Sequence, residues 1–215
     1  MKYLIDSANL DEIQKCLRYG FKGITANPSM YLKENVNFYE FIEACTNLNP
    51  EILTAEVIGN DLYELLDSCD KISNLNKNTI IKINFSEVGL ELINILNGKG
   101  VKTACTLIFN TNQASLAINA GADYLFPFIG RNDENGYDGI KNLTEICNLI
   151  SINGYNTKVV AASIKNVFHL TQASLCGCDY AAVTYDLFKK ASFNQLTIDG
   201  SNTFEKDWAK LINSN

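Results

Sequence analysis

Short apolar runs alternate with longer amphipathic stretches along the whole chain. The runs span three to seven residues, are rich in branched and aromatic side chains, and end at polar residues or glycine. They cover residues 2–5, 23–25, 52–58, 79–83, 102–108, 124–129, 158–162 and 180–184. Runs of this length and composition are typical of strands that are buried on both faces. The pattern therefore predicts eight strands.

The stretches between these runs carry apolar residues three and four positions apart, which places them on one side of an α-helix. The expected helices carry the apolar sets Leu10, Ile13 and Leu17; Phe38, Phe41, Ile42 and Cys45; Leu62, Leu65, Leu66 and Cys69; Leu90, Ile93 and Leu96; and Leu143, Ile146, Cys147 and Ile150. Asn9 and Glu12 have the spacing of a capping box. C-terminal glycines are expected at Gly20, Gly98, Gly121, Gly154 and Gly177.

Strands that alternate with helices indicate right-handed βαβ units and a parallel sheet. Eight units in about 200 residues favour an α/β fold of the (β/α)8 TIM-barrel type over an open doubly wound sheet. The first run is not followed by Gly-x-Gly-x-x-Gly, which weakens a dinucleotide-binding alternative. We expect one barrel domain over residues 1–215, with an additional C-terminal helical segment at about 186–215.

Composition narrows the possible functions. The 215 residues are 47% hydrophobic with only three prolines, which favours one sizeable core. The net charge of -6 and the absence of a Lys/Arg cluster argue against nucleic acid and anionic membrane surfaces as partners. The first residues do not resemble a signal peptide, and no apolar stretch approaches the ~18 residues of a membrane helix. We therefore expect a cytoplasmic protein.

The cysteines are seven in number and fall mostly at apolar positions, which is typical of reduced core residues. Cys176 and Cys178 lie close together, but the chain has a single histidine, His169, and no second cysteine pair. Neither a zinc site nor any other metal is expected. His169 falls on a helix after the seventh run and is interpreted as a structural residue.

Lys82 stands in the middle of the apolar run Thr79-Ile80-Ile81-Lys82-Ile83-Asn84. A buried, unpaired ammonium is costly, so a lysine at such a position has a carboxylate partner or a depressed pKa. A neutral lysine amine is a nucleophile toward carbonyl carbon. The alternative is that Lys82 lies at a strand end and extends to solvent.

Polar residues stand at or just after the ends of most predicted strands. In a (β/α)8 barrel these ends meet at one face, which carries the active site. The residues are Asp6, Asn27, Glu56, Lys82, Thr106, Arg131, Ser163 and Lys165. The barrel hypothesis thus predicts a cavity that contains carboxylates, amines, an amide, hydroxyls and a guanidinium.

Several segments also match one family in order and spacing. They are Ile5-Asp6-Ser7-Ala8-Asn9, Gly23-Ile24-Thr25-Ala26-Asn27-Pro28-Ser29, Ile81-Lys82-Ile83, Thr106-Leu107-Ile108-Phe109 with Gln113-Ala114, Gly121-Ala122-Asp123-Tyr124 through Pro127-Phe128-Ile129-Gly130-Arg131, Ala161-Ala162-Ser163-Ile164-Lys165 and Gly177-Cys178-Asp179. With these segments the chain resembles the transaldolases, in the short group that also contains the fructose-6-phosphate aldolases. The resemblance spans nearly the whole chain.

The resemblance implies a metal-independent, cofactor-free reaction through a Schiff base. Lys82 would attack the ketone of a sugar phosphate, and the iminium would accept electrons when the C3–C4 bond breaks. Asp6 would move the proton of the C4 hydroxyl. Glu56 and Thr106 would hold a water that relays protons.

The remaining implied residues bind substrate. Asn27 would orient the dihydroxyacetone portion, and Thr25 and Phe128 are further substrate-binding positions by resemblance. Arg131, Ser163 and Lys165 would hold the phosphate, and the last two follow strand seven, where barrels commonly bind phosphate.

Two positions favour transaldolase over its sister activity by resemblance. Transaldolases carry Glu and Phe where this chain has Glu56 and Phe128, whereas the aldolases carry Gln and Tyr. The chain also departs from the transaldolase pattern, with Ala104 in place of Asn, Lys165 in place of Arg, Ala26 in place of a second Thr and Asn84 in place of Pro. Lys165 exchanges a bidentate fork for a point charge.

The resemblance implies transfer of dihydroxyacetone from sedoheptulose 7-phosphate or fructose 6-phosphate to glyceraldehyde 3-phosphate or erythrose 4-phosphate. Two alternatives remain open: a fructose-6-phosphate aldolase, and a sugar-phosphate-binding barrel whose catalysis has decayed.

Trp208 lies in an apolar stripe on the last predicted helix. By resemblance, this helix reaches a neighbouring subunit, which implies a homo-oligomer, pentameric or decameric.

Overall fold

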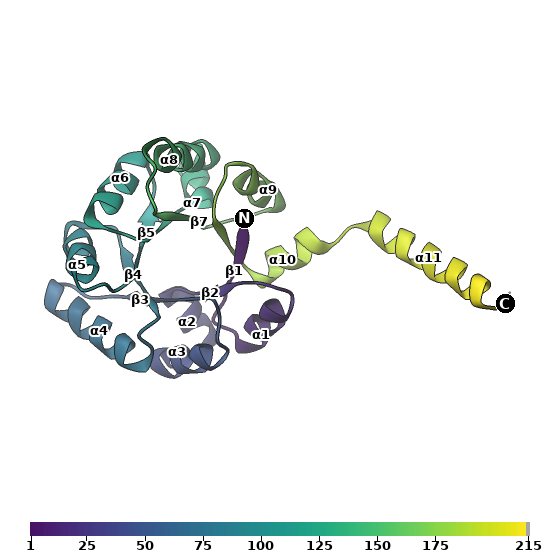
Figure 1. The fold of residues 1–215 in the computed structure, drawn as a ribbon, viewed down its shortest axis with the longest axis horizontal. Helices are drawn as coiled ribbons and strands as arrows, with labels where there is room; N and C mark the ends of the chain where they lie inside the picture. The colour runs from purple at the N-terminus through teal and green to yellow at the C-terminus, as the bar shows by residue number, and fades with distance from the viewer. Residues whose placement is uncertain (214–215) are drawn as a thin grey trace.

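Eight parallel strands close into a barrel in the computed structural model, which describes residues 1–213 (Figure 1). The strands are β1 (Lys2–Asp6), β2 (Gly23–Thr25), β3 (Ile52–Val57), β4 (Ile80–Asn84), β5 (Thr103–Ile108), β6 (Tyr124–Pro127), β7 (Lys158–Ala161) and β8 (Tyr180–Val183). Each strand pairs with the next one in sequence, and β8 closes the barrel on β1. The predicted α/β TIM barrel is confirmed.

Helices surround the barrel and connect successive strands (Figure 1). They are α1 (Leu10–Arg18), α2 (Pro28–Glu34), α3 (Phe38–Asn47), α4 (Leu62–Leu75), α5 (Glu87–Gly98), α6 (Thr111–Ala120), α7 (Ile129–Glu134), α8 (Gly139–Asn153), α9 (Val167–Leu175), α10 (Tyr185–Ser192) and α11 (Gln195–Asn213). The five amphipathic stretches of the sequence correspond to α1, α3, α4, α5 and α8. The short helices α2 and α7 lie at the mouth of the barrel and contribute to the cavity described below.

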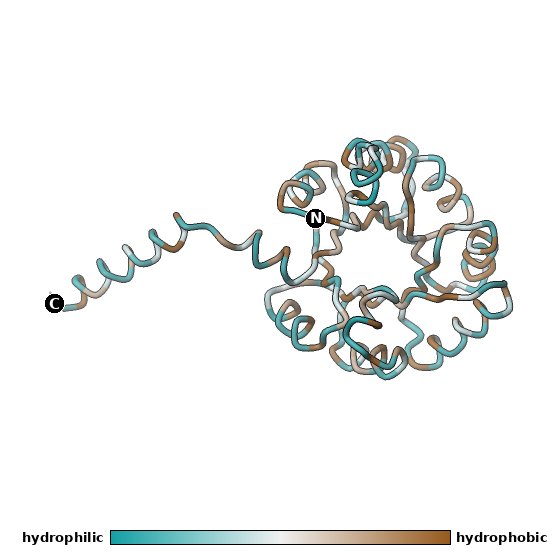
Figure 2. The backbone as a smooth tube through the Cα atoms, turned by 180° about the vertical axis from the view of Figure 1, so that it is seen from behind, coloured by the Kyte–Doolittle hydropathy of each residue, from teal (hydrophilic) through white to brown (hydrophobic). Residues whose placement is uncertain are grey.

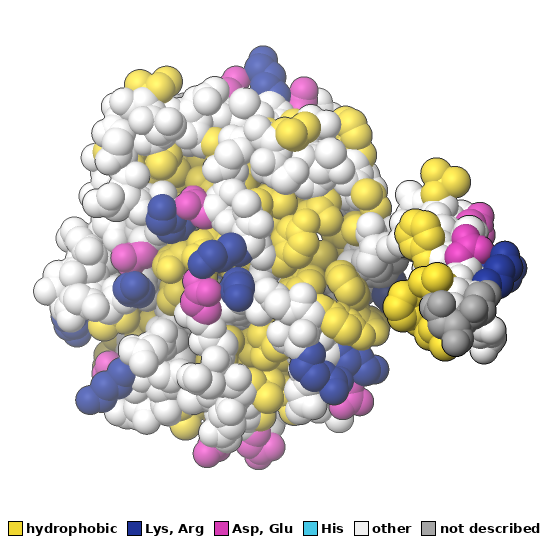
Figure 3. All heavy atoms as spheres, turned by 45° about the vertical axis from the view of Figure 1, so that its right-hand side comes forward, with side chains coloured by type: hydrophobic (Ala, Val, Ile, Leu, Met, Phe, Trp, Pro, Cys, Tyr) yellow, Lys and Arg dark blue, Asp and Glu magenta, His cyan; other side chains and the backbone are white. Residues whose placement is uncertain are grey.

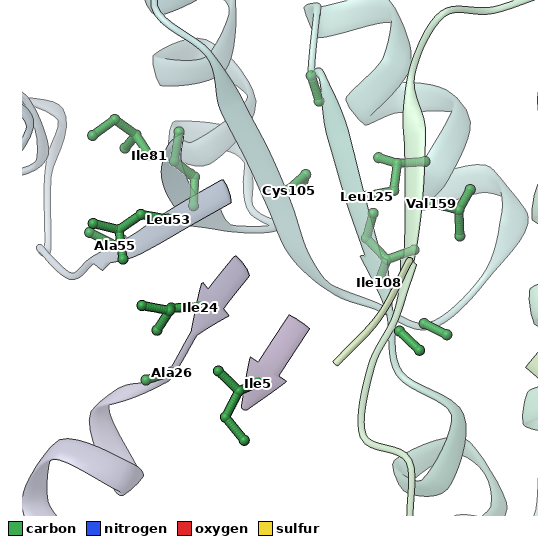
Figure 4. Close-up of a cluster of buried hydrophobic side chains, with 14 of the residues drawn as sticks. Ile5, Ile24, Ala26, Leu53, Ala55, Ile81, Cys105, Ile108, Leu125 and Val159 are labelled. Atoms are coloured by element: carbon green, nitrogen blue, oxygen red, sulfur yellow. The ribbon is translucent and has the colours of Figure 1, made fainter. Parts of the chain in front are cut away.

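Two apolar layers hold the barrel together, because successive side chains of a strand point to opposite faces. On β1, Ile5 belongs to the large layer between the barrel and its helices, part of which is shown in Figure 4. Leu4 belongs to the smaller layer inside the barrel, together with Ile80 and Phe126. The same alternation turns Asp6, two residues after Leu4, into the barrel interior at its carboxyl end.

Most helix ends follow the sequence signals. Gly121 and Gly154 adopt left-handed backbone at the ends of α6 and α8. Gly98 does not act as expected: it is the last residue of α5, and Gly100 adopts the positive φ of 71° that turns the chain. The Asn9 side chain accepts hydrogen bonds from the N–H groups of residues 11 and 12 and so caps α1.

Strand β6 is shorter than the apolar run 124–129 predicts. It ends at Pro127, and α7 begins at Ile129. Single hydrogen bonds to the neighbouring strand segments continue past Pro127: the Phe128 N–H donates to the carbonyl of Ile108, and the Ile129 N–H donates to that of Ala162. The chain then turns into α7, which carries Arg131 to the mouth of the barrel.

The C-terminal helix α11 extends away from the barrel as an arm (Figure 1). It has no buried residue, and hydrophobic and hydrophilic sections alternate along it as they do along the helices of the barrel (Figure 2). Apolar side chains gather toward one side of the arm and charged ones toward the other (Figure 3). Within residues 1–213, no helix is both long enough and apolar enough to cross a membrane.

Candidate active site

A cavity of about 550 Å³ opens at the carboxyl ends of the strands. The structure brings together all ten residues that the sequence singled out as catalytic or substrate-binding. They are Asp6, Thr25, Asn27, Glu56, Lys82, Thr106, Phe128, Arg131, Ser163 and Lys165. Their arrangement separates into an amine end around Lys82, inside the barrel, and a cation end around Arg131 and Lys165, beyond the strands.

Lys82 is buried at the amine end, with only 4% of its surface exposed. Its Nζ lies 2.9 Å from Glu56 Oε2 and donates a short hydrogen bond to the carbonyl of Ala26. Glu56 and Lys82 are paired in the register of β3 and β4, so the barrel wall itself sets their distance. Lys82 therefore has the carboxylate partner expected for a buried lysine and does not extend to solvent.

Asp6 shares the interior with this ion pair. Burial raises the pKa of the Asp6 carboxyl to about 6, the nearby Lys82 ammonium opposes that rise, and the Glu56 carboxylate adds to it. A carboxyl with a pKa near the working pH can both accept and return a proton. The amine end thus combines a potential nucleophile with a potential acid–base group.

Two polar side chains between the end of β2 and the start of α2 are held by hydrogen bonds to other residues. Asn27 caps α2, since its Oδ1 accepts from the Met30 N–H at 3.2 Å, which leaves its amide N–H groups for another acceptor. The Thr25 hydroxyl accepts from Thr54 at 2.8 Å inside the barrel. Both side chains are thereby fixed before any ligand binds.

Left-handed backbone occurs at two cavity-lining residues that are not glycine. Leu107 has a φ of 58° at an irregularity in the pairing of β5 with β6, directly after Thr106. Ser163 has a φ of 55° in the loop after β7. Such conformations cost about 1–3 kcal/mol each and concentrate at functional sites. The bulge at Leu107 changes the direction of the chain where Thr106 enters the cavity.

The cation end is built from α7 and from the loop after β7. The Arg131 guanidinium lies over the Phe128 ring, 5.1 Å from its centroid, and Lys165 Nζ lies 3.2 Å from Glu134 Oε1. The two segments approach closely because Gly130 has no side chain: a Cβ there would lie 2.3 Å from Lys165 Cγ. The Gly130 N–H also donates to the carbonyl of Ser163 at 2.9 Å. Two cations thus share one side of the cavity.

Further cavity residues were not predicted from the sequence as site residues. They are Pro28, Ser29, Met30, Ile58, Asn84, Leu107, Phe126, Ala162, Ile164, Ala182 and Thr184. The expectation that polar residues at strand ends line the site could have found Thr184, which directly follows β8. The alternation of inward and outward side chains along β6 could have found Phe126. Leu107 carries no such signal, because its place in the cavity depends on the bulge.

Comparison with known proteins identifies relatives over almost the full chain. A family model described as Transaldolase/Fructose-6-phosphate aldolase matches residues 3–215. A protein named probable transaldolase from Desulfitobacterium hafniense is 38% identical over 212 residues, which cover 98% of this chain and 100% of that protein. Probable transaldolases from Methanococcus maripaludis and Clostridioides difficile are 37% and 35% identical, each over 97% of both chains.

Proposed function

The chain belongs to the transaldolase/fructose-6-phosphate aldolase family, and we propose that it is a transaldolase that uses Lys82 as its Schiff-base residue. The proposed donors are sedoheptulose 7-phosphate and fructose 6-phosphate, and the proposed acceptors are glyceraldehyde 3-phosphate and erythrose 4-phosphate. The main support is the buried Lys82–Glu56 pair, which faces Asp6 in a cavity that carries two cations at its other end.

The proposed reaction begins when the Lys82 amine adds to the ketone carbon of the donor. Glu56, 2.9 Å away, accepts a proton from the ammonium, and a water held with Thr106 carries protons as the carbinolamine loses water. The product is an iminium between Nζ and the former ketone carbon. Because the iminium accepts electrons, the next step requires no metal.

Asp6 then removes the proton of the C4 hydroxyl. The C3–C4 bond breaks, its electron pair moves to the iminium nitrogen as an enamine, and the aldose phosphate leaves. An acceptor aldehyde adds to the enamine carbon, Asp6 returns its proton to the new hydroxyl, and water releases the product ketose. The amide of Asn27 orients the three-carbon unit throughout.

Phe128 favours transfer over release of free dihydroxyacetone, and Glu56 agrees with transfer by family resemblance. Phe128 lines the cavity but has no hydroxyl with which to activate a water against the enamine. The enamine therefore persists until an aldehyde acceptor arrives. Arg131, Ser163 and Lys165 hold the phosphate of donor and acceptor in turn, which places the reacting carbons at the amine end.

An assay with and without acceptor tests this proposal. Fructose 6-phosphate is supplied alone or together with erythrose 4-phosphate, and release of glyceraldehyde 3-phosphate is followed with a coupled enzyme. A transaldolase gives sustained product only with the acceptor. Sustained product without it would identify an aldolase, and substrate-dependent thermal stabilisation without turnover would identify a binding protein.

The assembly that we propose is a homo-oligomer, pentameric or decameric by family resemblance, located in the cytoplasm. Its support is α11, which has no buried residue and carries exposed apolar side chains that include Leu196, Phe204, Trp208 and Ile212. Light scattering of the full chain, compared with a chain ending at Ser192, tests this assembly. An unchanged number of subunits after truncation would show that α11 does not hold the subunits together.

A further inference from the structure

His169 connects the two segments that carry the cations of the cavity. It lies on α9, is buried with 9% exposure, and places Nε2 at 3.0 Å from Asp133 Oδ2 on α7. Its Nδ1 accepts a longer hydrogen bond, 3.4 Å, from the N–H of Lys165. In these two bonds Nε2 faces a carboxylate and Nδ1 accepts, so one ring contacts both α7 and the loop after β7.

Further hydrogen bonds hold Asp133 on one side of the His169 ring and the start of α9 on the other. Asp133 Oδ1 accepts from the Gly139 N–H at 2.9 Å, which ties α7 to the start of α8. On the other side, the His169 N–H donates to the Asn166 side chain at 2.8 Å, which caps α9 and attaches this helix to the loop. The Nε2–Asp133 bond therefore adds a buried side-chain link between the two segments, next to the Gly130–Ser163 backbone bond and the exposed Lys165–Glu134 ion pair.

This link has a consequence for the cations. Arg131 is two residues before Asp133 on α7, and Lys165 is four residues before His169. A shift of α9 and its loop relative to α7 would change the separation of the two cations without moving the strands that carry Lys82 and Asp6. A planar or tetrahedral anion that binds both cations needs that separation to be constant.

We propose that His169 is a positioning residue for phosphate recognition, which it serves through its Nε2 bond to Asp133 by holding Lys165 and Arg131 at a fixed separation. The inference rests on the proposed function only in assigning the phosphate to these cations. It concerns a residue that touches no substrate. His169 does not line the cavity, and its ring is occupied by the two bonds described.

Two matched variants separate positioning from simple stability. In His169→Gln the amide nitrogen takes the place of Nε2 and can still reach Asp133. In His169→Asn the shorter amide takes the place of Nδ1, keeps the Lys165 N–H bond and loses Asp133. Both variants are neutral and polar, but Gln has the higher helix propensity, so thermal unfolding of each variant is measured beside phosphate binding to account for a difference in stability.

The first readout is calorimetric binding of inorganic phosphate to the full chain. We expect the Kd of the Gln variant to stay within about threefold of wild type and that of the Asn variant to rise about tenfold, the effect of one lost hydrogen bond to a charged group. The second readout is the rate at which dihydroxyacetone and borohydride modify Lys82. It should be the same in both variants, because dihydroxyacetone carries no phosphate.

Equal phosphate affinity in the two variants would overturn the inference, and so would absence of phosphate binding by the wild-type chain. The calorimetric readout does not depend on turnover. If wild type binds phosphate with the expected Gln–Asn difference but Lys82 forms no adduct with any ketose phosphate, the proposed transaldolase reaction fails while the role of His169 stands.

Discussion

The two ends of the cavity are built in different ways. At the amine end, Lys82, Glu56 and Asp6 stand on barrel strands, and the register of β3 and β4 sets the contact between the first two. At the cation end, Arg131 is exposed and Lys165 is half exposed; they come from a short helix and a loop beyond the strands. The barrel wall holds the first group, whereas side-chain contacts such as His169–Asp133 hold the second.

This difference matches the two kinds of work that the proposed reaction requires. Covalent chemistry depends on nucleophile and acid–base groups that stay within a fraction of an ångström of their places, and strands provide that rigidity. Phosphate binding must be reversible and must serve donor and acceptor in turn. We therefore expect changes at the amine end to reduce kcat and changes at the cation end to raise KM.

Lys82→Met should have the largest effect, a loss of more than about 10⁴-fold in kcat/KM, because the other amine of the cavity, Lys165, lies at the cation end and pairs with Glu134. The acceptor-dependent assay measures this loss, and circular dichroism checks that the variant is folded. Residual activity within about tenfold of wild type would place the nucleophile elsewhere.

Asp6→Asn should reduce kcat by about 10²- to 10⁴-fold, the usual contribution of a general acid–base group. Schiff-base formation should continue, since Lys82 and Glu56 are intact. Borohydride should then trap the whole ketose on Lys82 rather than the three-carbon unit, and peptide mass spectrometry distinguishes the two adducts. A three-carbon adduct formed at the wild-type rate would show that another group removes the C4 proton.

The pH dependence should follow the raised pKa of Asp6, which burial brings to about 6. Because the carboxylate is the reactive form, kcat for cleavage should fall about tenfold per unit as the pH decreases below 6. The free energy of unfolding should change with pH in the opposite direction to kcat. Folding raises the pKa of Asp6 from 3.8 to about 6, so its stabilising contribution is full below pH 4 and is lost as the pH rises through 6.

The stability part of this prediction is measured by urea unfolding of wild type and of Asp6→Asn between pH 4 and 7. The free energy of unfolding of the Asn variant should increase relative to wild type as the pH rises. A constant difference across this range would mean that Asp6 does not titrate there.

Arg131→Ala should raise KM for fructose 6-phosphate by about 10- to 100-fold, because it removes a charge-assisted contact to phosphate. Modification of Lys82 by unphosphorylated dihydroxyacetone should be unchanged. If kcat falls instead while KM is constant, the separation of the cavity into two functional ends is wrong.

Glu134→Gln should have the smallest effect, a decrease of about two- to threefold in KM. Its carboxylate lies 3.2 Å from Lys165 Nζ on the surface and competes with phosphate for that cation, and exposed pairs of this kind are weak. Steady-state kinetics at low salt measures the change. An increase in KM would indicate that Glu134 orients Lys165 rather than competing for it.

The sequence was most informative where the pattern of a strand determines the position of a side chain. All eight strands were predicted because branched apolar runs between polar residues leave few alternatives. With the barrel assumed, the strand ends at Asp6, Glu56 and Lys82 had to meet at one face. The cavity confirms their proximity, whereas their chemical roles stay predictions.

The sequence was least informative where contacts depend on loops. The run 124–129 reads as one strand, yet α7 begins within it. The positive φ of Leu107 and Ser163 has no signal in residue type, since neither is glycine or asparagine. The bond between Asp133 and His169 joins residues 36 positions apart on two helices, so the histidine looked like an isolated structural residue.

The most direct test of the account is borohydride trapping with fructose 6-phosphate, followed by peptide mass spectrometry of the wild-type chain. We predict an adduct with the mass of reduced dihydroxyacetone on Lys82, absent from Lys82→Met and decreased when excess erythrose 4-phosphate is added before borohydride. Absence of an adduct on Lys82 with every ketose phosphate tried would contradict the Schiff-base reaction and with it the proposed transaldolase activity.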